Sequence, residues 1–214
     1  ANPNLGHWKN TFKSWPSLEK SWPAWYKRVS ASKQVHWDEL GIGQPLALTI
    51  ANLAKDAPLL VSASYFWSNT LNAFLFNQGP MTPTLIDITM ITGLDVTSPI
   101  NPMSLNTKNT FEFKTKSIGG WSGYIGAYMG KGSVSSREYV AFLLMWLEKF
   151  LFYRSSCGPT TNWQFLAEAL ETKKQIPLGK ILLGYLYQML GNASAKISAQ
   201  SLAQVGRGGC YKLG

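Results

Sequence analysis

The strongest hydrophobic pattern in the chain lies between residues 138 and 154. Apolar side chains recur there three and four residues apart, as at Phe142 and Trp146, and a second apolar set covers most of the remaining surface of the predicted helix. A helix with so little polar surface must be buried. Glu148 and Lys149 interrupt the apolar run well short of the ~20 residues that a membrane span needs, so we expect no membrane association.

The ends of this helix are also marked in the sequence. Ser135 and Glu138 have the spacing of a capping box, in which the serine hydroxyl and the glutamate carboxylate satisfy free backbone N–H groups. Cys157, Gly158 and Pro159 follow its far end. We therefore expect this segment to be the central helix of the fold.

Shorter periodic stretches predict further helices on both sides of the central one. They cover residues 37–40, 45–54, 58–71, 83–92 with Thr82 as cap and Gly93 as stop, 162–171, 177–190 with Gly191 as stop, and 194–205. The predicted structural core takes one or two large side chains from several of these helices: Trp67, Leu85, Ile88, Phe142, Trp146, Tyr185 and Leu186.

Strand signals are weaker. Residues 74–76 with the turn that follows predict a small hairpin with residues 79–82, and residues 111–116 alternate as an exposed strand does. Glycines between residues 119 and 132 predict a flexible loop, because their spacing departs from that of a phosphate-binding loop. The expected fold class is mainly α, a compact multi-helix domain around a central buried helix, with a small β-hairpin or short strands.

The first 36 residues form a basic, tryptophan-rich segment that we expect to pack on or flank the main domain. Cations alternate there with large rings, an arrangement with which proteins bind single-stranded nucleic acid. The candidate nucleic-acid-binding residues are Lys20, Trp22, Trp25, Lys27, Arg28 and Lys33. The alternative is that the rings are core side chains and the lysines face water. Residues 37–205 are the predicted helical domain and residues 206–214 a flexible tail.

Composition adds a weak functional signal. The formal charge is +9 and the pI is near 9.5, which favours an acidic partner, yet only 14% of the residues are charged. The residues 82–93 resemble the first half of a helix-turn-helix, but Pro99 and Pro102 stand where a recognition helix would begin.

Catalytic chemistry is not indicated. The chain has two histidines, His7 and His36, and two cysteines, Cys157 and Cys210, too few at useful spacing for a zinc site. Cys157 with His36 and Asp38 could form a nucleophile set only if the fold brought them together. We expect no enzyme activity, no metal and no cofactor.

Several blocks together resemble the plant mobile domain family, which is also catalogued as "aminotransferase-like". They are residues 67–96, with Thr82-Pro83-Thr84-Leu85, Asp87 and Gly93-Leu94, residues 139–147, Leu166-Ala167, and residues 183–187. The resemblance spans about residues 20–205. It implies a mostly helical domain found in transposable elements and in plant proteins derived from them. Such host proteins are nuclear and linked to transposon silencing, gene expression and meristem maintenance, and some relatives carry a fused phosphatase-like domain.

The aminotransferase label fails when it is compared with the residues. No Schiff-base lysine, acid for a pyridine nitrogen and phosphate-binding loop can be assembled from this chain. The sequence therefore predicts a non-catalytic nuclear protein-interaction domain of transposon-derived origin. Its expected partners are proteins, a phosphatase-like protein among them. The alternative is direct nucleic-acid binding through the N-terminal segment, and weak binding of this kind is expected in either case.

Overall fold

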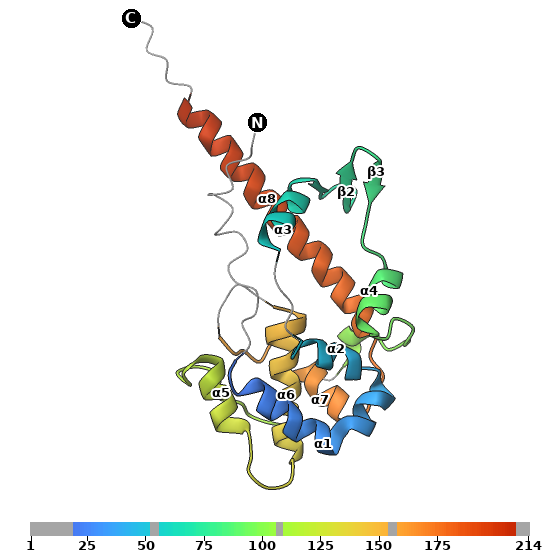
Figure 1. Cartoon of the computed structure of the whole chain (residues 1–214), viewed down its shortest axis with the longest axis vertical. Helices are drawn as coiled ribbons and strands as arrows, with labels where there is room; N and C mark the ends of the chain where they lie inside the picture. The colour runs from blue at the N-terminus through green and yellow to red at the C-terminus, as the bar shows by residue number, and fades with distance from the viewer. Residues whose placement is uncertain (1–18, 52–55, 106–108, 154–157, 209–214) are drawn as a thin grey trace, which may run out of the picture. The chain divides into compact units, whose positions relative to one another are not determined.

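The computed structural model describes residues 19–51, 56–105, 109–153 and 158–208 (Figure 1). These residues divide into two compact units. The larger unit holds the described residues of 19–51 and 85–182, and the smaller unit holds residues 56–84 and the part of the last helix that begins at residue 183. The mainly α fold with short strands that the sequence predicts is confirmed.

All regular secondary structure described in the larger unit is helical. Its elements are α1 (Trp22–Leu40), α2 (Gly43–Leu48), α4 (Leu85–Thr92), a 3-10 turn (Pro102–Ser104), α5 (Gly120–Tyr128), α6 (Ser136–Met145), a π-helical segment (Trp146–Leu151), α7 (Gln164–Glu171) and the first residues of α8 (Leu178–Gly208). The helix α6 packs against α5 and α7.

The predicted central helix is present as α6 and the π-helical segment that continues it. Every side chain from Glu138 to Lys149 is buried. The hydroxyl of Ser135 accepts the backbone N–H of Glu138 at 3.2 Å, which confirms the predicted cap. The Glu138 carboxylate does not reach back toward Ser135 as a capping box requires, because it binds α1 instead. Within the described part of the chain, none of the helices combines the length and the apolar character that crossing a membrane requires.

The smaller unit combines α3 (Ala57–Tyr65) and a three-stranded antiparallel sheet with the later residues of α8. The sheet order is β1 (Trp67–Ser68), β2 (Ala73–Phe76) and β3 (Gly79–Met81). Phe74 pairs with Trp67 on one side and with Met81 on the other. The predicted hairpin is therefore confirmed, and β1 adds a strand that the sequence did not predict.

Several predicted boundaries are wrong. The predicted turn at residues 37–40 is the end of the longer helix α1, so the expected segment boundary at residue 36 falls inside a helix. Thr82 does not cap α4, because its hydroxyl donates to the Asn72 carbonyl and the helix begins at Leu85. Residues 206–208, assigned to a flexible tail, belong to α8.

Two glycine predictions are wrong for the same physical reason. Residues 120–128 form α5 rather than a flexible loop, and a side chain at Gly123 would meet the Ile118 carbonyl oxygen at 1.6 Å. Gly191 does not end its helix, since α8 continues to Gly208. The Asn69 amide lies close to Gly191 and donates to its carbonyl oxygen at 3.4 Å. At both glycines another residue approaches closely, Ile118 from the preceding turn and Asn69 from a distant part of the chain, which sequence periodicity does not reveal.

The predicted strand at residues 111–116 is absent. Phe113 is buried and packs edge-on against Tyr128, with ring centroids 5.1 Å apart. The backbone N–H groups of Thr110 and Phe111 donate to the Glu168 carboxylate rather than to a neighbouring strand. Residues 94–101 contain no helix, so the second half of a helix-turn-helix is missing, as the two prolines indicate.

The predicted core residues are not all equally buried. Trp67, Ile88, Phe142 and Trp146 are buried. Leu85, Tyr185 and Leu186 are half-buried.

Candidate functional site

The tryptophans of α1 are core residues. Trp22, Trp25 and Trp37 are fully buried around Phe142 of α6. Trp22 stacks on the Phe142 ring with centroids 4.7 Å apart, and Trp25 meets the same ring edge-on at 5.5 Å. The stacking role predicted for Trp22 and Trp25 is therefore wrong, because neither ring has a face on which a nucleic-acid base could lie.

Arg28 is half-buried and is held in a hydrogen-bonded network with the buried Glu138. Its guanidinium donates to the Glu138 carboxylate at 2.8 and 3.0 Å, and the indole N–H of Trp25 donates to the same carboxylate at 3.1 Å. Burial acts to raise the pKa of Glu138, but hydrogen bonds from Arg28, from the Gly130 N–H and from Trp25 outweigh it and hold the pKa below its usual range. This network joins α1 to α6, so the role of Arg28 is structural.

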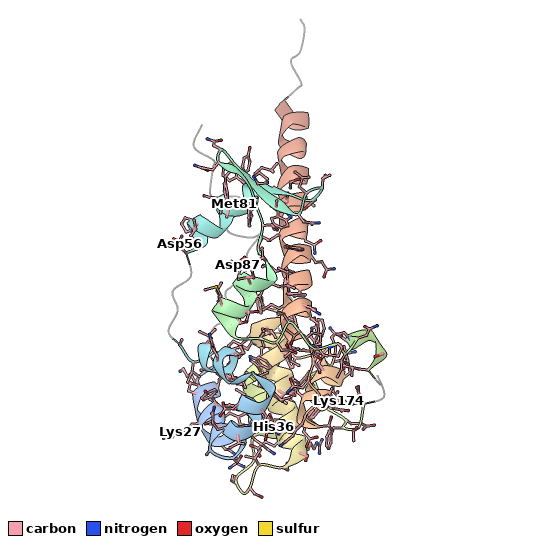
Figure 2. All side chains as sticks on the ribbon, turned by 90° about the vertical axis from the view of Figure 1, so that its right-hand side faces the viewer. Lys27, His36, Asp56, Met81, Asp87 and Lys174 are labelled. Carbon is pink, nitrogen blue, oxygen red and sulfur yellow. The ribbon has the colours of Figure 1, made fainter. Side chains whose placement is uncertain are left out.

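The remaining predicted nucleic-acid-binding residues are lysines on α1 or just before it. Lys20 and Lys27 are exposed, and Figure 2 labels Lys27 on α1. The ammonium group of Lys33 lies 4.9 Å from the centre of the Tyr139 ring, a cation–π contact. Nucleic-acid binding through these lysines stays a prediction, but it would rest on phosphate contacts without base stacking.

The smaller unit carries a continuous row of aromatic rings. Adjacent ring centroids along it are 4.9 to 5.7 Å apart. In order, the rings of this aromatic row are Tyr65, Phe66, Phe76, Phe74, Trp67 and Tyr187. Toward one end Trp67 is buried and Tyr187 is half-buried, whereas at the other end Tyr65 is 63% exposed and Phe66 is exposed as well.

Aliphatic side chains extend the exposed apolar surface beside the aromatic row. Met81 pairs with Phe74 across the hairpin and is 59% exposed, and Figure 2 labels it at the sheet. Leu75 is also exposed but points to the opposite face of the hairpin, because side chains alternate along a strand. Leu59 and Leu71 are exposed in the same unit.

This surface lies in a part of the chain that has no charge. No Asp, Glu, Lys or Arg occurs between Asp56 and Asp87. Asp56 itself accepts the N–H of Leu59 at 2.9 Å and so caps α3. Such a surface has no cation for a phosphate group, but it can bury apolar side chains of another protein. The long uncharged stretch could have indicated this surface from the sequence.

The described residues offer little catalytic chemistry. Among them, no three His, Cys, Asp or Glu side chains converge where they could hold a metal ion. The His36 ring is hydrogen-bonded to the Leu170 carbonyl at 2.8 Å, and Asp38 accepts from Gln34. His7, Cys157 and Cys210 lie outside the described residues, so the nucleophile set with Cys157 cannot be compared with the structure.

Comparison with known proteins gives one match. The family model described as "Plant mobile domain" matches residues 41–213, a range that begins directly after α1. No curated protein and no solved structure matches the chain.

Proposed function

Because this chain belongs to the plant mobile domain family, we propose that it is a non-catalytic protein-interaction domain of transposon-derived origin. It acts in the nucleus of plant cells, in the silencing of transposable elements, in gene expression or in genome maintenance. Its partners are proteins, and a phosphatase-like protein is the partner class that the family resemblance favours.

The observation that carries this proposal is the aromatic row, whose exposed end lies in the uncharged stretch of residues 57–86. Exposed apolar surface of this kind marks interaction sites on folded proteins, and aromatic and methionine side chains are enriched in protein interfaces. Since residues 57–86 contain no charge, the partner contributes aliphatic or aromatic side chains rather than phosphates or carboxylates. Direct nucleic-acid binding lacks comparable support, since Trp22 and Trp25 are buried.

The non-catalytic part of the proposal is supported by what the buried carboxylates do. Glu138 binds Arg28 and Trp25, and Glu168 accepts backbone N–H groups of residues 110 and 111. Both carboxylates are used to hold segments together. Among the described residues, neither carboxylate belongs to a group of three His, Cys, Asp or Glu side chains that could hold a metal ion.

A binding experiment with matched variants tests the proposal. The double variant Phe66→Ser with Met81→Ser removes apolar surface from the exposed part of the aromatic row. The control pair Ile86→Ser with Met90→Ser removes apolar side chains that are even more exposed, from α4 in the other unit. Leu75→Ser, on the opposite face of the hairpin, is a control within the same unit.

The assay measures the affinity of the full chain for a plant phosphatase-like protein, with circular dichroism as a check that each variant is folded. We expect the aromatic-row variant to weaken binding at least tenfold, as for central interface residues, and both controls to bind normally. Equal weakening by the α4 pair, or unchanged binding by the aromatic-row variant, would contradict the proposal. Nanomolar, sequence-specific binding of DNA would favour the nucleic-acid alternative instead.

A further inference from the structure

The larger unit exposes apolar side chains on two helices that pack together, α2 and α4. On α4, Ile86 and Met90 lie one turn apart and are 70% and 78% exposed. The exposed apolar side chains of α4 and of the end of α2 are defined here as the α2–α4 surface: Leu48, Ile50, Ile86, Met90 and Ile91. Side chains of this size that face water on neighbouring helices indicate that something packs on them.

One acidic side chain lies within this surface. Asp87 is on α4, where the helical spacing places it between Met90 and Ile91 on the exposed side, and Figure 2 labels it there. No other charged residue occurs in α2 or α4. An occupant that matches the surface therefore brings apolar side chains bordered by cations, and no acids.

The chain itself has a segment of this composition ahead of α1. Residues 1–18 lie outside the described residues, so the pattern comes from the sequence alone. Lys9 and Lys13 are its cations at neutral pH, and no acid precedes Glu19. Large apolar residues recur at spacings of three and four and would share one face of a helix, with the two lysines at its border: Leu5, Trp8, Phe12 and Trp15.

The start of α1 brings this segment close to the α2–α4 surface. The indole N–H of Trp22 donates to the Thr49 hydroxyl at 2.8 Å, so the first turn of α1 lies beside the end of α2. Thr49 stands between Leu48 and Ile50 in the sequence. Trp15 is only seven residues before Trp22, and an extended chain of that length spans up to about 25 Å, whereas α4 is about 12 Å long. The segment can therefore reach both helices of the surface.

We propose that residues 5–15 pack as an amphipathic helix on the α2–α4 surface of their own chain. The rings of Trp8 and Phe12 cover Ile86 and Met90, a pairing that suits methionine because its sulfur packs favourably on aromatic rings. Lys9 and Lys13 border the same contact and complement the charge of Asp87.

The short connection to α1 favours the segment of the same chain over that of a second copy. A short tether gives an effective concentration of about millimolar, well above the concentration of a second copy in a dilute sample. The inference concerns a surface other than the aromatic row, so it goes beyond the proposed function and is tested separately from it.

The test is amide hydrogen exchange of the full chain, measured by mass spectrometry on short peptides. We expect the amides of residues 5–15 to exchange at least tenfold more slowly than those of an unstructured chain of the same sequence. The double variant Ile86→Ser with Met90→Ser should speed their exchange at least fivefold. Reciprocally, Trp8→Ser with Phe12→Ser should speed the exchange of the α4 amides.

Two controls separate this contact from general loosening of the fold. Val35→Ser removes an equally exposed apolar side chain from α1, outside the α2–α4 surface, and should leave the exchange of residues 5–15 unchanged. The pair Phe66→Ser with Met81→Ser changes the aromatic row and should leave it unchanged too. Circular dichroism shows whether each variant is folded, which we expect because all the replaced side chains of the described residues are exposed.

Three results would overturn the inference. Rapid exchange of residues 5–15 in the parent protein would show that they are not packed. Faster exchange in the Phe66 and Met81 variant instead of the α4 variant would place them on the smaller unit. Protection that grows with protein concentration would assign the contact to a second copy. The affinity for the phosphatase-like protein is measured independently and should be normal in the Ile86 and Met90 variant, so this inference and the proposed function can fail separately.

Discussion

Replacing Trp25 with alanine tests whether the N-terminal rings are core or nucleic-acid contacts. The indole is 0% exposed and lies against Trp22, Phe142 and Tyr124. A buried tryptophan removes roughly 150–250 Å² from water, which at about 25 cal/mol per Å² corresponds to about 4–6 kcal/mol as an upper bound. Because alanine keeps part of that burial, we expect a loss of about 3–5 kcal/mol in the free energy of unfolding.

The hydrogen bond of the indole can be separated from its packing. Trp25→Phe keeps most ring contacts but removes the donor to Glu138, whose carboxylate still has Arg28 as a partner. We expect this variant to lose about 1–2 kcal/mol. Val35→Ala is the control on the same helix, because Val35 is 71% exposed and its replacement should change stability by no more than about 0.5 kcal/mol.

The assay is urea unfolding followed by far-ultraviolet circular dichroism. The slope of the unfolding free energy against urea concentration is compared between variants, so that differences in the midpoint concentration of urea can be converted to free energies. Binding of a labelled single strand is measured on the same samples. If Trp25 stacked on a base, the Trp25→Ala substitution would cost about 1–3 kcal/mol of binding free energy and leave the free energy of unfolding unchanged. A destabilisation below about 1 kcal/mol would therefore refute the placement of this ring in the core.

The remaining predictions address the core, the backbone and the charges. Trp146→Ala, at a residue that is 1% exposed, should also cost about 3–5 kcal/mol in urea unfolding, and a loss below about 1 kcal/mol would contradict its burial. The pKa of Glu138 is lowered in the folded state, so the ionised carboxylate stabilises the fold at neutral pH, and this contribution is lost as the pH falls from about 5 toward 3. The melting temperature of Glu138→Gln should therefore fall less over that pH range than the melting temperature of the parent protein. Gly123→Ala should prevent α5 from packing as it does, because the new methyl group would overlap the Ile118 carbonyl, and helical content measured by circular dichroism should fall. Nucleic-acid binding should be weak, with a dissociation constant of roughly 10⁻⁴ to 10⁻⁶ M. Joint replacement of Lys20, Lys27 and Lys33 by Gln should reduce the dependence of this affinity on salt, but by less than the loss of three phosphate contacts would. Titrations at two salt concentrations measure this dependence.

Local signals were sufficient for some elements. The central helix has an apolar pattern that only burial satisfies and a serine whose hydroxyl binds the N–H of Glu138, and both are short-range features. The hairpin of β2 and β3 was predictable for the same reason. Most of α8 was predicted as two helices, but α5 and the continuity of α8 through Gly191 were not, because Gly123 faces the Ile118 carbonyl and Gly191 faces the Asn69 side chain only in the folded chain. Sequence alone makes such glycines look like loops or helix ends.

The candidate site was only partly predictable. Trp22, Trp25 and Val29 follow one another at spacings of three and four, which is the buried stripe of a helix, but the alternation of rings and cations in the same segment equally suggested a nucleic-acid surface. Only the partners decide between them, and Phe142 and Glu138 are more than a hundred residues away. The exposed end of the aromatic row was missed because residues as apolar as Phe66 and Met81 are expected inside.

The distribution of charge weakens the argument from the net charge of +9. In the larger unit the described cations and acids nearly balance, and Arg28 and Lys149 are used in ion pairs with Glu138 and Glu19. Most of the excess comes from residues whose side chains the structure does not describe: Lys9, Lys13, Lys55, Lys108, Arg154, Lys196, Arg207 and Lys212. An attraction to nucleic acid would therefore draw mainly on those residues and would be weak and strongly dependent on salt. The stretch between Asp56 and Asp87 carries no charge, so the affinity of a partner bound through the aromatic row should depend little on salt. This binding should persist at salt concentrations that abolish binding to nucleic acid.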